Sequence, residues 1–171
     1  MLSSEITNAL NVQINAELWS AYLYLSMSLD AADKGLSGVS NWFYVQSREE
    51  EDHARIIQHY MNDQGAKVEL MPIASVPTSW DTPLDMFNDA LAHERKVTSM
   101  ICHVAKLATE ISDYATYIRM QWFITEQIEE ESSAREMVNK MELAMNSDSL
   151  LYHIDCNMAS RRYSSASALQ E

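Results

Sequence analysis

Glycine and proline are scarce in this chain, and between them apolar residues recur at helical spacing. The 171 residues include only three glycines and three prolines, too few for the tight turns that an all-β sandwich or barrel needs. The spacing instead predicts an all-α fold. We expect four long helices over about residues 4–33, 40–64, 83–110 and 113–145, and a short fifth helix over about residues 149–159.

Most of the expected helix boundaries carry a recognisable signal. Gly35 follows the first helix and Gly65 follows the second, as is common at helix ends. Thr82 and Pro83 are typical of a helix start, because the hydroxyl caps the first turn and proline suits the first helical position. The break between the third and fourth helices contains neither glycine nor proline, and we place it near Ser112.

The linker between the second and third helices sets the topology. Residues 65–81 lose the periodicity and include Pro72 and Pro77. At ~3.3 Å per residue these residues can span ~56 Å, whereas a 28-residue helix is ~42 Å long, so the linker can run back along the whole bundle. We expect two antiparallel hairpins joined by one long crossover; a plain up-down bundle with a mobile loop is the alternative. One domain over residues 1–163 and a loose tail over residues 164–171 are expected.

Composition and charge exclude several classes of protein. The chain has 12 basic and 25 acidic residues, a formal net charge of −13, which disfavours nucleic acid as a partner. The longest uncharged apolar run near the start, residues 18–29, is too short to span a membrane, and no basic segment precedes it. Cys102 and Cys156 lack CxxC spacing. We therefore expect a cytoplasmic protein with both thiols buried or idle.

Polar groups that can bind metal interrupt the apolar stripe of each long helix. They are Glu17 on the first helix, Glu50 and His53 on the second, Glu94 on the third, and Gln127 and Glu130 on the fourth. Spacings of three and four residues aim these groups at the bundle interior. Several buried carboxylates would repel one another and take up protons, whereas a divalent cation would compensate their charge. A buried polar network tied to Arg, Lys or Tyr is the alternative.

The same groups recur at equal intervals in the two predicted hairpins. Glu17 to Glu50 spans 33 residues, as does Glu94 to Gln127. An offset of 77 residues places Glu17, Glu50, His53 and Glu49 on Glu94, Gln127, Glu130 and Glu126, in that order. The two hairpins thus present polar groups at matched depth. Carboxylate oxygens with one imidazole suit iron or manganese better than structural zinc or calcium, and Glu-x-x-His is an element of di-iron bundles.

The residues that carry this pattern resemble a bacterial non-haem ferritin. The resemblance covers residues 5–162 and rests on Glu17, Glu94, the run from Arg48 to Ala54, and the segment from Trp122 to Glu130. It implies a ferritin-like four-helix bundle with a short C-terminal fifth helix. The implied activity is ferroxidase: oxidation of Fe(II) by dioxygen or hydrogen peroxide, with storage of a ferric mineral inside a hollow cage of twenty-four copies.

The resemblance also implies a role for each candidate residue. Glu17, Glu50 and His53 would bind one iron, while Glu94, Gln127 and the shared Glu50 would bind a second, with Glu130 nearby. A third, neighbouring iron site would comprise Glu49, Glu126, Glu129 and Glu130. Tyr24 and Trp122 match aromatic positions beside the oxidation centre.

Departures from related families bear on the cofactor. Bacterioferritins repeat Glu-x-x-His on the fourth helix and carry a haem-binding methionine directly after the glutamate of the second helix; here Gln127 and Glu130 stand in the repeat and Glu51 follows Glu50. We therefore expect iron without haem. Two alternatives stay open: a di-iron or di-manganese oxidase or catalase that stores nothing, and an inert cage subunit.

Overall fold

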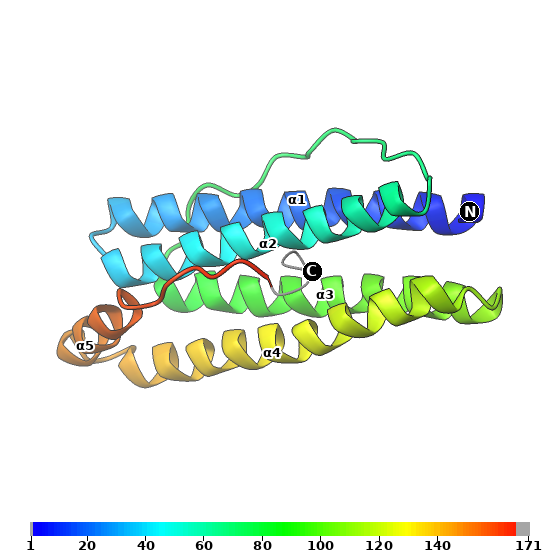
Figure 1. Cartoon of the computed structure of the whole chain (residues 1–171). Coiled ribbons are helices and arrows are strands. Elements are labelled where there is room, and N and C mark those ends of the chain that lie inside the picture. Colours follow the sequence, from blue (N-terminus) through cyan, green and yellow to red (C-terminus); the bar gives the residue numbers. More distant parts are fainter. Residues whose placement is uncertain (1, 167–171) are drawn as a thin grey trace.

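The computed structural model describes residues 2–166, which form five helices and a long linker (Figure 1). The helices are α1 (Ser4–Asp33), α2 (Ser37–Asp63), α3 (Pro83–Glu110), α4 (Tyr114–Ala144) and α5 (Asp148–Met158). The predicted all-α fold is confirmed, since the described residues contain no strand. The second helix begins three residues earlier than its periodicity indicated, because its first turn is held by α5.

The helix boundaries follow from local chemistry. The Ser3 hydroxyl accepts a hydrogen bond from the Ile6 amide at 3.2 Å and caps α1. Thr82 and Asp85 form a reciprocal capping box at the start of α3, which satisfies amides that have no partner within the helix. Ser112 adopts a left-handed φ of 60° between α3 and α4, so a residue other than glycine makes the break there.

The four long helices pair as two antiparallel hairpins, α1 with α2 and α3 with α4 (Figure 1). Between them the linker runs back along α1, as the expected crossover requires. Side chains of α1 fix its path: the Asn11 amide donates to the Lys67 carbonyl at 3.3 Å, and the Ser26 hydroxyl donates to the Pro77 carbonyl at 2.6 Å. The crossover therefore packs against α1 and is not a free loop.

The apolar core is divided into two clusters by a polar layer. One cluster includes Tyr24, Phe43 and Phe87, and the other includes Leu10 and Phe123. On each of the four long helices the metal-binding candidates of the sequence lie between residues of the two clusters. The bundle therefore holds these groups in the middle of its length, with apolar packing on both sides.

Cys102 and Cys156 are both exposed free thiols, so the expectation that they are buried is wrong, while the alternative that they are idle stays a prediction. Of the expected loose tail over residues 164–171, the structure describes residues 164–166, where the Ala166 amide donates to Asp52 at 3.1 Å; residues 167–171 lie outside the described residues. No helix in residues 2–166 combines the length and apolar character needed to cross a membrane.

Candidate metal centre

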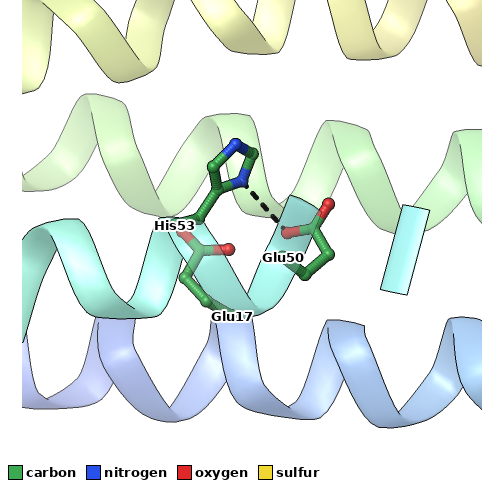
Figure 2. A group of neighbouring side chains, drawn as sticks. All are labelled: Glu17, Glu50 and His53. Atoms are coloured by element: carbon green, nitrogen blue, oxygen red, sulfur yellow. Dashed lines mark hydrogen bonds and ion pairs between the residues drawn. The ribbon is translucent and has the colours of Figure 1, made fainter. Parts of the chain in front are cut away.

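Three side chains from the first hairpin converge in the polar layer. Glu17 from α1 and Glu50 and His53 from α2 each place one ligand-type atom within 4.8 Å of the others, and all three are buried. Figure 2 shows their polar ends turned toward one another, with His53 Nδ1 3.3 Å from a Glu50 oxygen. Glu17 Oε2 is buried and has no hydrogen-bond partner within the described residues. A buried oxygen without a partner is costly, so it is a natural ligand for a cation.

The second hairpin contributes Glu94 from α3 and Gln127 from α4. The Tyr24 hydroxyl donates to one oxygen of Glu94, and the Gln127 amide donates to the other oxygen at 3.0 Å. Gln127 also donates to the Glu94 main-chain carbonyl and to the Thr98 hydroxyl, both at 3.3 Å. Glu130 turns to α2, where it accepts from the Gln46 amide at 2.5 Å. Hydrogen bonds therefore fix the orientation of the Glu94, Gln127 and Glu130 side chains.

Burial disfavours charge on every carboxyl of this layer. Burial, and then repulsion from Glu50, raise the pKa of Glu17 from 4.5 to about 8. Burial and repulsion from Glu94 raise the pKa of Glu50 well above its ordinary value. Burial is also the largest of several causes that raise the pKa values of Glu94 and Glu130. A divalent cation would favour the ionised form of each group, so its binding would displace protons.

A second acidic group lies beside this layer. Glu49, Glu126, Glu129 and Glu130 line one cavity of about 190 Å³ together with His53. Burial raises the pKa of Glu49 and of Glu126. Glu49 is also paired within the chain, because the Arg161 guanidinium donates to it at 2.5 Å. The four residues expected at a third iron site therefore lie around the same cavity. One of them, Glu49, is already paired with the positive charge of Arg161.

Comparison with known proteins agrees with this architecture. Residues 7–144 match the ferritin-like domain family. The chain belongs to the ferritin-like family. Among curated relatives, a bacterial non-heme ferritin of Bacteroides fragilis is 37% identical over 94% of this chain and its own full length. One of Staphylococcus aureus is 31% identical over 95% of this chain and 98% of its own. A solved open pore ferritin of Archaeoglobus fulgidus has a TM-score of 0.94 and 39% identity, over 95% of this chain and all of its own.

The ferritin-like bundle contains three contributors that spacing alone did not assign to the site. The Gln13 amide donates to Glu17 Oε1 at 2.8 Å, and the Gln46 amide lies 3.4 Å from Glu50 Oε1. Each glutamine precedes its glutamate by four residues, so the repeated Gln-x-x-x-Glu spacing was the available signal. Arg161 had no such signal, because it follows α5 and reaches the site only through the path of the chain.

The donor set fits the chemistry of iron. Carboxylate oxygens, one imidazole and one neutral amide are hard or intermediate ligands that suit iron and manganese. Next to these donors, the ring centroids of Trp122 and His53 lie 5.7 Å apart, and the Tyr24 hydroxyl donates a hydrogen bond to Glu94. Glu17, Glu50 and His53 in particular are placed so that they could hold a metal ion.

Proposed function

We propose that this chain is an iron-storage ferritin whose buried centre oxidises Fe(II). The observation that carries the proposal is the convergence of Glu17, Glu50 and His53, where one carboxylate oxygen of Glu17 has no hydrogen-bond partner in the described part of the chain. Isolated buried acids are unfavourable for a fold, so their retention on two helices favours a role in binding cations. Membership of the ferritin-like family and the bacterial non-heme ferritin relatives favour iron as the cation.

In this proposal two ferrous ions bind side by side within one chain as substrate. Glu17, Glu50 and His53 hold the first ion, whereas Glu94, Gln127 and the shared Glu50 hold the second, with Glu130 next to it. Gln127 is a neutral donor and leaves the second position weaker, so its ion moves on after oxidation. Glu49, Glu126, Glu129 and Glu130 form a neighbouring third position.

The chain's own groups manage charge and protons during the reaction. Ion binding displaces the protons that burial keeps on Glu17 and Glu50, and the resulting carboxylates stabilise Fe(III) more than Fe(II). The Tyr24 hydroxyl holds Glu94 in place through its hydrogen bond. Dioxygen or hydrogen peroxide accepts one electron from each ferrous ion.

Storage requires more than one copy of the chain. We propose a homo-oligomeric cage of twenty-four copies, as the resemblance to bacterial non-haem ferritins implies. We propose that this cage acts in the cytoplasm and needs neither haem nor nucleic acid. The net charge of −13 then attracts ferrous ions and provides acidic groups for the ferric mineral.

The test adds Fe(II) in air to the purified metal-free protein and follows ferric absorbance and particle size by size-exclusion chromatography. We expect a large particle that gains iron colour. The double variant Glu17→Ala/His53→Ala should lose the fast phase of oxidation, because it removes two of the three converging ligands. The matched control is Glu136→Gln, which changes an exposed glutamate of α4 and should oxidise iron at the natural rate.

Each alternative gives a different result in this experiment. An oxidase or catalase that does not store iron would oxidise Fe(II) while the ferric product precipitates outside a small particle. An inert cage subunit would stay large and show the same slow oxidation with and without the double substitution. Either result would overturn the proposal.

A further inference from the structure

The segment after α5 turns back over the bundle and reaches the acidic cavity. We call residues 159–166 the C-terminal strap; in Figure 1 it runs from the α5 end toward the middle of the molecule. Its first part is held by the Asn41 side chain of α2, which donates to the main-chain carbonyls of Met158 at 3.1 Å and Arg161 at 3.0 Å. Ser164 and Ala166 line the cavity formed by the third-site acids.

A buried carboxylate anchors the far part of the strap. Asp52 of α2 is 1% exposed, and its Oδ2 accepts from the Tyr163 hydroxyl at 2.7 Å and from the Ala166 amide at 3.1 Å. The Arg48 guanidinium lies 4.7 Å from the centre of the Tyr163 ring. The strap is therefore fixed to α2 on both sides of Arg161.

Arg161 also lines the acidic cavity, and several partners hold its guanidinium. Its Nη2 donates to Glu49 Oε2 at 2.5 Å, and both terminal nitrogens donate to Gln46 Oε1 at 3.1 Å. Nη1 also donates to the Trp42 carbonyl at 3.2 Å, and the group lies 4.7 Å above the Trp42 ring. With these partners the positive charge is held in one position.

The same guanidinium reaches the centre through Gln46. Because Arg161 occupies the amide oxygen of Gln46, the amide nitrogen must point the other way. There it donates to Glu130 at 2.5 Å and lies 3.4 Å from Glu50. Arg161 thus fixes one acid of the third group directly and another, together with Glu50, through one intermediate side chain.

We propose that Arg161 competes with a third divalent ion for Glu49, so that the C-terminal strap sets how many ions the centre holds. The inference rests on the proposed function, since it concerns the third position beside the two-ion centre. A divalent ion among Glu49, Glu126, Glu129 and Glu130 would lie close to the guanidinium, and like charges at such distances repel strongly. The third ion therefore binds only when Arg161 leaves Glu49. Arg161 is a positioning residue in this role.

The test counts bound ions instead of oxidation. The metal-free cage is titrated with Zn²⁺, and without oxygen with Fe²⁺, by isothermal calorimetry. We expect two tight ions per chain in the natural protein and three in Arg161→Ala, with the third ion bound about tenfold or more tightly than in the natural protein. Arg161→Lys keeps the charge and should restore two. Arg161→Ala/Glu49→Gln should lose the third ion again, which a merely structural role would not produce.

Controls separate charge at this place from charge in general and from folding. Arg162→Ala is matched, because within residues 2–166 that neighbouring side chain donates only to the main-chain carbonyls of Ala159 and Arg161; the variant should bind two ions. Should Arg161→Ala fail to assemble, Arg161→Gln removes the charge and keeps amide donors. A third ion of equal affinity with and without the Arg161 charge would overturn the inference. Absence of the first two ions would contradict the proposed function instead.

Discussion

At the residue scale, Glu17 lies where its neutral form is favoured. Its pKa in the folded chain is about 8, against an ordinary value of 4.5, because of burial first and Glu50 second. The unfolded chain loses this proton near pH 4.5, whereas the folded metal-free chain keeps it until near pH 8. Between these values the unfolded state binds fewer protons, so the free energy of unfolding falls as pH rises.

Glu17→Gln should remove this loss, because an amide does not titrate. We expect the metal-free variant to exceed the natural chain in free energy of unfolding by ~3–5 kcal/mol at pH 8, since each pKa unit is worth about 1.4 kcal/mol, and to differ little at pH 5. Denaturant unfolding after chelation, at both pH values, measures this difference. Glu142→Gln, at an exposed position of α4, serves as the control. An equal gap at both pH values would mean that ionisation of Glu17 is not the cause.

Gln127→Glu tests whether a neutral donor keeps the second position weak. The variant loses the hydrogen bond to Glu94 and adds a negative charge that holds the second ion more tightly. We expect a first oxidation phase near the natural rate and later turnovers slower by about fivefold or more. This corresponds to an activation barrier for iron release that is higher by ~1 kcal/mol or more. Stopped-flow absorbance over repeated Fe(II) additions measures this. Gln121→Glu, at an exposed position of the same helix, is the control, and unchanged later turnovers would refute the interpretation.

A site residue can be predicted from the sequence when it lies on a regular helix, and not when it lies on an irregular segment. Glu17, Glu50 and His53 stand on regular helices, so three- and four-residue spacing places them on the same face, and the structure brings them together. Their roles as ligands stay a prediction. Arg161 lies on an irregular segment whose path depends on contacts with Asp52 and other distant residues. Periodicity carries no information about such contacts.

At the element scale, the start of α2 depends on α5. The N-cap residue Leu36 makes no side-chain capping bond; instead Asp155 of α5 accepts from the Val39 amide at 2.8 Å. This distant cap explains why α2 begins earlier than its periodicity indicated. The start of α3, by contrast, is visible in sequence because Thr82, Pro83 and Asp85 are consecutive or nearly so. Local caps are predictable, whereas tertiary caps are not.

Gly38 allows this close packing of α2 and α5. A Cβ at this position would lie 1.7 Å from the Asp155 carbonyl oxygen. Gly38→Ala should therefore push α5 away and destabilise the fold by ~2 kcal/mol or more, although alanine is the better helix former by ~1 kcal/mol. Thermal unfolding measures the loss. Ser37→Ala, at the exposed neighbouring position, should change the unfolding temperature little. Equal stability of both variants would show that α5 moves freely.

At the scale of the whole molecule, linker length and contacts together determine the topology. The length of residues 65–81 permits a crossover, and a plain up-down bundle is also compatible with length alone. The path along α1 is settled by Asn11, Asn15 and Ser26, whose side chains bind linker carbonyls. These polar residues lie on the side of α1 that the linker covers, and nothing in the sequence around them distinguishes them from solvated side chains. The fold class was therefore predictable, but the contacts that select this crossover were not.

The net charge of −13 belongs to the whole molecule and predicts a salt dependence of iron uptake. An acidic protein attracts ferrous ions over a range set by the Debye length, about 30 Å at 0.01 M salt and about 8 Å at 0.15 M. We expect the uptake rate at limiting Fe(II) to fall about threefold or more between these conditions, while oxidation of already bound iron stays constant because the buried centre is little screened. Sucrose of equal osmolarity should have no effect. A uniform slowing of uptake and oxidation would instead mean that salt acts on the centre itself and that long-range attraction contributes little.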